Sequence, residues 1–191
     1  MPESIEIFIR LLSFSRDKCV VLRKIIRMQE RLLLLPKDAK DKATETKKFF
    51  NKLKKRVPKN LDNQVAAIHD EVFEKMDCMS CANCCKTTGP LFMKQDIERI
   101  SKFIGTKPAQ FEKQYLRIDE DNDWVLKQVP CTFLGIDDEC TIYDVRPKAC
   151  QEFPHTDRKK IYQIANLTIA NTAICPAAFD IVERMKTAIK L

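Results

Sequence analysis

The stretch DCMSCANCCKTTGP, residues 77–90, decides the fold, because it places four cysteines within eight positions. In a C-x2-C spacing, one tight bend can present both sulfurs to the same metal ion. Four further cysteines follow singly, at Cys131, Cys140, Cys150 and Cys175. Residues 131–150 hold few apolar side chains for their length, and such a segment needs a metal to order it. The sequence therefore predicts an irregular cysteine-rich metal-binding domain.

Composition indicates the compartment and excludes some enzyme classes. The chain begins MPESIEIFIR, with acidic residues where a signal peptide is basic, and no apolar run approaches the roughly 18 residues of a membrane span. We expect a cytoplasmic protein without a membrane span, whose cysteines bind metal or do redox work. If the chain were exported, a disulfide scaffold would be the alternative. Only three glycines occur and no Gly-rich phosphate loop is present, which argues against the usual nucleotide enzymes.

Apolar periodicity predicts a mainly α fold with a small β-hairpin, in which N-terminal helices precede the cysteine-rich domain. We expect helices over 3–34, 37–57, 60–76, 94–104, 108–116 and 176–189. Pro36 is expected to end the first of them, and Thr106 to cap the helix that opens at Pro108. LRIDEDNDWVLKQV, residues 116–129, reads as a hairpin around a solvated acidic turn. The sequence therefore predicts two regions: a helical extension over residues 1–59 and the metal-binding domain over residues 60–191.

The helix expected over 37–57 is strongly basic. From Lys37 to Lys59 the chain carries ten Lys or Arg and three Asp or Glu, so this stretch has the net charge of the whole chain, +7. A basic helix can bind nucleic acid or an acidic membrane surface, but no base-reading motif accompanies it. A solvated face that covers the core is the simpler interpretation, and docking of an unknown protein partner is the alternative.

Eight cysteines suffice for two tetrahedral sets. Neighbouring side chains point in different directions, so Cys84 and Cys85 most easily serve different centres. We group Cys78, Cys81, Cys84 and Cys175 in one set, and Cys85, Cys131, Cys140 and Cys150 in the other. A grouping through local hairpins stays open, as does one set of unligated buried thiols. The C-x2-C-x2-C run with the pair Cys175-Pro176 resembles bacterial ferredoxin ligands, which favours an iron–sulfur cluster slightly over zinc.

The two histidines and one arginine are further candidates for roles at this site. His155 follows Cys150 closely and is a candidate ligand, although a supporting or surface position is expected more for it and for His69. Arg146 is expected either to donate to backbone carbonyls of its loop or to pair with Asp144.

The cysteine run, followed by CTFLGIDDECTIYDVRPKACQEFPHTDRKK over residues 131–160, resembles the YkgJ-type cysteine-cluster family, described as a zinc- or iron-chelating domain. The family pattern is CxxCxxCC, then C-x-F-L, then C-x-I-Y-x-x-R-P-x-x-C-x-x-F-P. Every element has its counterpart here: Cys131, Phe133, Leu134, Cys140, Ile142, Tyr143, Arg146, Pro147, Cys150, Phe153 and Pro154. The resemblance covers roughly residues 35–180 and leaves out the first 34, so Met28 is a candidate for the true start. It implies metal chelation by the cysteines.

Three classes of function remain. An iron–sulfur protein would transfer electrons or sense redox state. A module stabilised by structural zinc would instead bind a partner through the basic helix. Enzymatic catalysis at an open metal position is the third class, and no paired carboxylates, Ser–His–Asp arrangement or H-E-x-x-H motif supports it. Larger relatives of the resembled family include flagellin lysine methylases thought to carry an iron–sulfur cluster. This chain has no G-x-G loop for S-adenosylmethionine, so methylase activity is not expected.

Overall fold

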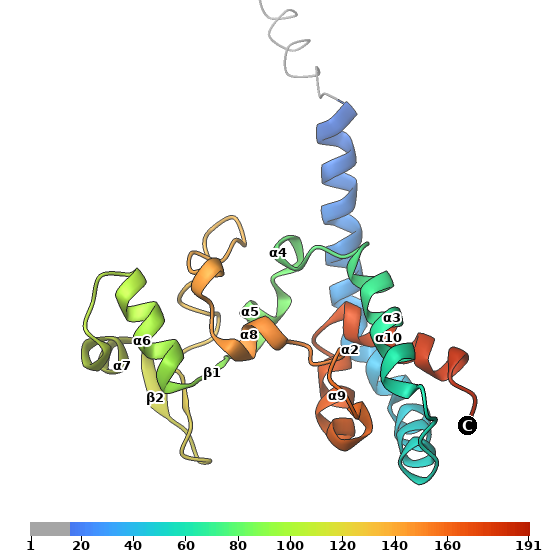
Figure 1. The fold of residues 1–191 in the computed structure, drawn as a ribbon. Helices are drawn as coiled ribbons and strands as arrows, with labels where there is room; N and C mark the ends of the chain where they lie inside the picture. The colour runs from blue at the N-terminus through green and yellow to red at the C-terminus, as the bar shows by residue number, and fades with distance from the viewer. Residues whose placement is uncertain (1–15) are drawn as a thin grey trace, which may run out of the picture.

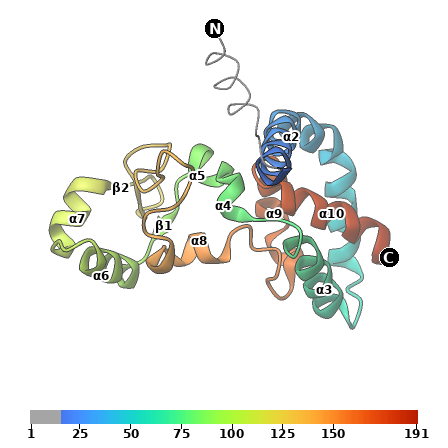
Figure 2. The ribbon, with the colours of Figure 1, turned by 90° about the horizontal axis from the view of Figure 1, so that it is seen from above.

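The structure, a computed structural model, describes residues 16–191 and consists of two lobes (Figure 1). The helical lobe contains α2 (Arg16–Lys55), α3 (Leu61–Phe73), the short 3-10 helix η2 (Ile161–Ile164), α9 (Ala165–Thr172) and α10 (Pro176–Ala188). The sheet lobe contains β1 (Leu91–Phe92), α6 (Lys94–Phe103), α7 (Pro108–Tyr115), β2 (Leu116–Ile118), β3 (Trp124–Leu126) and the 3-10 helix η1 (Tyr143–Val145). The short helices α4 (Cys78–Cys81), α5 (Asn83–Thr87) and α8 (Lys148–Glu152) run between the lobes (Figure 2). The prediction of a mainly helical fold with a small hairpin is confirmed.

The long helix α2 corrects one prediction. Pro36 lies inside it, exposed, and does not end a helix, so the two helices predicted on either side form one. The proline removes one backbone hydrogen bond, but Leu35 and Ala39 beside it are 2% and 6% exposed, and this burial keeps the helix continuous. Residues 1–15 of the predicted first helix lie outside the described residues. In the part of the chain that the structure describes, no helix has both the length and the apolarity to cross a membrane.

The core of the helical lobe forms where one face of α2 packs on α9 and α10, and α3 packs on the same α10. Phe50 and Leu53 of α2 are fully buried there with Leu61 of α3 and Ile181 of α10. Fully burying a side chain of this size contributes about 1.5–3 kcal/mol. Because the second half of α2 belongs to this core, the helix expected as a basic extension is part of the helical lobe. A domain boundary at residue 59 stays a prediction.

A three-stranded antiparallel sheet, with strand order β1-β3-β2, organises the second lobe. The predicted hairpin is confirmed, with Leu116 paired to Leu126 and Ile118 to Trp124. Strand β1 was not predicted, because its two residues are too short to show an alternating pattern. Phe111, fully buried, stacks on Phe133 with the ring centroids 6.0 Å apart. This contact fastens the segment after Cys131 to the core of the lobe.

The helices of the sheet lobe follow the predictions, with one correction. Helices α6 and α7 lie within one residue of the expected ranges. Thr106 does not cap α7, however, because the N-cap residue is Lys107, which makes no side-chain cap bond. The Thr106 hydroxyl is buried and has no hydrogen-bond partner among the described residues. Pro at the first position of α7 leaves one fewer backbone N–H to satisfy, which lessens the need for a cap.

Candidate metal centre

The four cysteines of the C-x2-C-x2-C-C run lie in the segment that leaves the helical lobe. Cys78 opens α4 and Cys81 closes it, and the side chain of Asp77 caps the helix by accepting from the backbone N–H of Met79 at 3.0 Å. Ala82 then adopts a left-handed conformation with φ 47°. This reversal ends α4 after one turn and starts α5, which places Cys84 and Cys85 within a second short helix. The local fold therefore presents four thiols on two consecutive turns.

Cys175 is brought to this segment by a contact over a long sequence separation. The amide of Asn83 donates to the carbonyl of Ile174 at 2.6 Å, which joins the start of α5 to the residue before Cys175. Cys175 itself is the N-cap of α10, and its sulfur accepts from the backbone N–H of Ala178 at 3.5 Å. Burial raises the pKa of Cys175, and the backbone N–H groups at the helix start, which favour negative charge, act in the opposite direction.

Cys131 and Cys140 approach the same segment from the sheet lobe. The backbone N–H of Cys131 donates to the carbonyl of Cys85 at 2.7 Å. An isolated antiparallel bridge between Leu134 and Cys140 closes the loop that joins the two cysteines. The tip of this loop is fixed to α5 by an ion pair of 2.5 Å between Lys86 and Asp138. These contacts place both cysteines beside α5.

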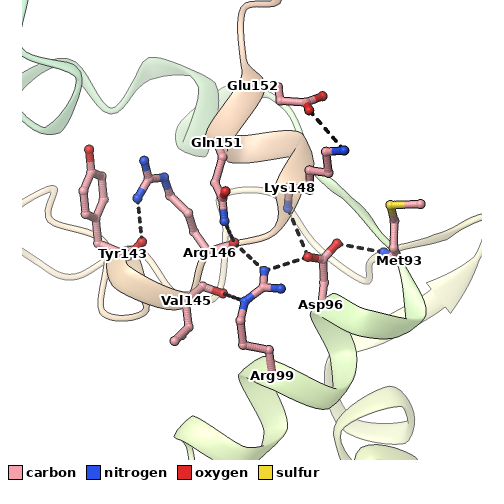
Figure 3. Close-up of polar contacts among 9 residues, drawn as sticks. All are labelled: Met93, Asp96, Arg99, Tyr143, Val145, Arg146, Lys148, Gln151 and Glu152. Carbon is pink, nitrogen blue, oxygen red and sulfur yellow. Dashed lines mark hydrogen bonds and ion pairs between the residues drawn. The ribbon is translucent and has the colours of Figure 1, made fainter.

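Cys150 is positioned by a buried polar network that the sequence did not reveal (Figure 3). Asp96, only 2% exposed, accepts from the backbone N–H of Lys148 at 3.1 Å and from Arg99 at 2.7 Å. Arg99 donates in turn to the carbonyls of Val145 and Arg146, at 3.3 and 2.8 Å. The network thereby fastens the start of α8, and Cys150 within it, to helix α6. The sequence carries only a weak signal of this network, namely an acidic residue in the first turn of a helix. Asp96 stands at that position and also accepts from the backbone N–H of Met93.

Eight thiols surround two adjoining cavities between the lobes. We call the smaller one, about 30 Å³, the inner cavity; its cysteines are Cys78, Cys81, Cys84 and Cys175. The larger one, about 390 Å³, is the interlobe cavity; its cysteines are Cys78, Cys84, Cys85, Cys131, Cys140 and Cys150. All eight are free thiols. Nowhere in the described residues do three or more His, Cys, Asp or Glu side chains already stand close enough to share one ion. The structure thus places the thiols around the cavities and not at one point.

The thiols influence one another electrostatically. Burial raises the pKa of Cys131 to about 11 and those of Cys150 and Cys175 to about 12. Burial likewise raises the pKa of Cys78, Cys81 and Cys140. Neighbouring sulfurs add to this effect, since a second negative charge nearby opposes ionisation. For Cys150 these neighbours are Cys85, Cys131 and Cys140, and for Cys175 they are Cys78 and Cys81. A metal cation bound among the sulfurs would offset both the burial of the thiolates and the repulsion between them.

The adjacent pair behaves differently from the rest. A hydrogen bond between the two side chains lowers the pKa of Cys85 to about 7, although burial opposes this. The same bond, together with burial, raises the pKa of Cys84. The thiolate that forms first is therefore that of Cys85, with the thiol of Cys84 as its donor. Both residues border the interlobe cavity, and Cys84 also borders the inner cavity.

Arg146 brings a positive charge to the site. Its guanidinium donates to the carbonyl of Tyr143 at 2.8 Å and lies 3.9 Å from the centroid of the Tyr143 ring. The prediction that Arg146 donates to a backbone carbonyl of its loop is confirmed. Burial dominates the raised pKa values of Cys78, Cys140 and Cys150, and the charge of Arg146 acts in the opposite direction. Arg146 thus favours the thiolate forms on both sides of the site.

The two histidines lie at different edges of the site. His69 borders the interlobe cavity, where its Nδ1 atom is 2.9 Å from the hydroxyl of Thr156 and its ring lies against Phe73. His155 borders a further cavity of about 180 Å³ beside Cys85 and Cys150. The expectation of a supporting or surface position for both histidines, with a ligand role for His155 as the alternative, stays a prediction.

The comparisons with known proteins agree with this chemistry. The model of the CxxCxxCC family, whose description reads "Putative zinc- or iron-chelating domain", matches residues 77–175. The match runs from the residue before Cys78 to Cys175, covers more than half of the chain and includes all eight cysteines around the cavities. No solved structure matches the chain. The chain therefore belongs to the CxxCxxCC family of zinc- or iron-chelating domains.

Proposed function

We propose that the chain is a metal–thiolate protein in which two sets of four cysteines each hold a metal centre. The first set is Cys78, Cys81, Cys84 and Cys175, and the second is Cys85, Cys131, Cys140 and Cys150. One observation carries this assignment. The inner cavity is bordered by the four cysteines of the first set and by no other described cysteine, whereas the interlobe cavity is bordered by all four of the second.

Electrostatics supports the same division. This holds for Cys175, whose ionisation is opposed by thiols of the first set, and for Cys150, whose ionisation is opposed by thiols of the second. Cys78, Cys81 and Cys84 are in addition opposed by Cys85 of the second set, so the two sets adjoin. Cys84 and Cys85 are the point where the sets meet, since successive residues of a helix point about 100° apart. Two adjacent cysteines can therefore supply one ligand to each of two neighbouring centres, which is a reason for the unusual pair.

The donor set fits the metals that the family description names. Thiolate sulfur is a soft ligand that selects zinc and iron–sulfur clusters over magnesium or calcium. We favour an iron–sulfur cluster as the resident group, because three cysteines at C-x2-C-x2-C spacing with a remote Cys-Pro pair match the ferredoxin pattern. The cluster would supply reversible one-electron chemistry, and the chain would hold it through its thiolates and shield it between the lobes. The inner cavity is small enough for a single ion, which keeps zinc as the second candidate.

The placement of the cysteines also indicates what either metal would do for the fold. The two lobes have separate hydrophobic cores, with no residue common to both. Cys175 packs against the core of the helical lobe, and Cys131 and Cys140 pack against the core of the sheet lobe. Metal held by the two sets would join both lobes to the α4–α5 segment, and so fix one lobe relative to the other.

The experiment that tests this function is metal and acid-labile sulfide analysis of the full chain purified without oxygen. Iron with a matching amount of sulfide, together with a visible absorption band, supports the iron–sulfur assignment. About two zinc ions per chain without sulfide or colour supports a structural role for the metal. Protein that folds fully with neither metal, and takes up neither on reconstitution, overturns the proposal.

A further inference from the structure

We propose that the outward face of α2 docks the protein on an anionic lipid bilayer. This surface lies away from the cysteines and takes no part in the metal site. It is defined by Ile25, Ile26, Leu33, Lys37, Lys40, Lys47, Lys54 and Lys55, and we call it the α2 outer face. All eight side chains are exposed.

The periodicity of α2 places these residues on one side of the helix, which changes direction between its first and second parts (Figures 1 and 2). At 100° per residue they fall within an arc of about 120°. The buried side chains Leu35, Phe49 and Leu53 fall on the far side of the helix, and the buried Phe50 lies just outside one edge of the arc. Between Ile25 and Lys55 the helix rises about 45 Å at 1.5 Å per residue. The first part of this helix projects beyond the helical lobe (Figure 1).

The α2 outer face carries no acidic side chain. The acidic residues from 23 to 55 are Glu30, Asp38, Asp41 and Glu45, and by the same periodicity all four fall outside the arc of the outer face. The lysines of the outer face form no ion pair with any described residue. The protein thus exposes five lysines without ion-pair partners on one side of the helix. This arrangement is complementary to a negatively charged surface.

Apolar side chains at the projecting end identify the partner as lipid. Ile25 is 46% exposed, Ile26 is 48% and Leu33 is 81%. These three side chains fall within the same arc of the helix as the lysines, so the outer face is apolar at one end and basic at the other. A membrane surface suits both parts, because apolar side chains enter the acyl boundary while lysines attract anionic headgroups. A nucleic acid would leave the isoleucines and Leu33 without a role, and the outer face offers no aromatic ring for stacking on bases.

The test is co-sedimentation of the full-length protein with phosphatidylcholine vesicles that contain or lack phosphatidylserine, in low salt. Binding is expected only with phosphatidylserine and is expected to weaken as salt rises. The triple variant Lys40→Glu, Lys47→Glu and Lys54→Glu should bind at least a hundredfold more weakly, since each lysine near such a surface contributes roughly tenfold or somewhat less. The matched control is Lys102→Glu, Lys113→Glu and Lys159→Glu, which makes the same change of charge at exposed positions outside α2. This control should bind like the wild type.

A second pair of variants tests the apolar end. Ile26→Gln with Leu33→Gln leaves the charge unchanged and should weaken vesicle binding, whereas Ile118→Gln with Ile136→Gln, exposed in the sheet lobe, should not. Circular dichroism and the metal content of each variant show whether it is folded. No sedimentation of the wild type with phosphatidylserine vesicles overturns the proposal. Binding to duplex DNA that does not depend on Ile26 and Leu33, and exceeds vesicle binding at the same salt, also overturns it.

Discussion

The carboxylate of Asp96 accepts a hydrogen bond from the backbone N–H of Lys148 at 3.1 Å, across 52 residues of sequence and two residues before Cys150. The same carboxylate forms an ion pair with Arg99 at 2.7 Å and is 2% exposed. A buried charge that bridges two segments fixes their separation, because breaking any of its bonds leaves the charge without compensation. Asp96 thus positions a cysteine that it does not touch.

The first prediction concerns this carboxylate. Asp96→Asn keeps the size of the side chain but removes its charge, and an amide cannot accept all three donors that Asp96 now satisfies. We expect a loss of about 2–3 kcal/mol in the free energy of unfolding, and weaker retention of metal by the second cysteine set. Urea unfolding and competition with a chelator measure the two effects. Glu98→Gln, on the exposed side of the same helix, is the control. Equal behaviour of both variants would contradict a positioning role.

Elements that are defined by a local pattern could be predicted from the sequence, whereas features that depend on remote contacts could not. The ranges of α6 and α10 could be predicted because a local apolar stripe and a clear stop define each of them. Pro36 misled the prediction, because the packing of Leu35 and Ala39 on the core outweighs the local cost of a proline. Asp96 could not be identified as a positioning residue, since its partner Lys148 is remote in sequence and contributes only a backbone N–H.

For the cysteines, the sequence indicates the chemistry but not the arrangement in space. Their type and the C-x2-C spacing were enough to indicate metal chelation, as the family match shows. The sequence favours one grouping into two sets and leaves a grouping through local hairpins open, because spacing does not say which remote cysteine joins which centre. Two hydrogen bonds of the α5 segment bring the remote cysteines near: the side-chain amide of Asn83 donates to the carbonyl of Ile174, and the backbone N–H of Cys131 donates to the carbonyl of Cys85. No local pattern encodes either contact.

The second prediction tests the two sets separately. Cys81→Ser removes a thiol that borders only the inner cavity, and Cys140→Ser one that borders only the interlobe cavity. Each variant is expected to lose about half of the bound metal, because a set of three thiolates binds metal more weakly than four. Cys19→Ser, outside both sets, is the control. If either variant lost all of its metal, the sets would form one centre; if both kept wild-type metal, the assignment would be wrong.

The third prediction concerns pH. Burial raises the pKa of Cys150 and Cys175 to about 12 from an ordinary 9.0, so the metal-free folded state keeps protons that the unfolded state releases. The contribution of these two thiols to the free energy of unfolding of the metal-free protein should therefore be constant below pH 9 and fall from pH 9 toward pH 12. Cys85, whose pKa is lowered to about 7, should contribute a rise between pH 7 and pH 9. Metal binding displaces those protons, so metal affinity should rise with pH below 9. Urea unfolding at several pH values measures the first trend. Cys150→Ser should flatten it, and a slope unchanged in that variant would contradict this origin.

The fourth prediction concerns removal of the metal. Residues 131–150 lie mostly in loops, and only Phe133, Ile142 and Pro147 among them are buried. Removing metal should therefore lower the melting temperature and expose this segment first, while α3 and α10 keep their own apolar core. Hydrogen exchange followed by mass spectrometry, with and without chelator, resolves the two regions. Amide protection in residues 131–150 should be lost on chelation, and protection in Leu61–Phe73 should remain. Unchanged protection in both regions, with an unchanged melting temperature, would show that the lobes do not depend on the metal.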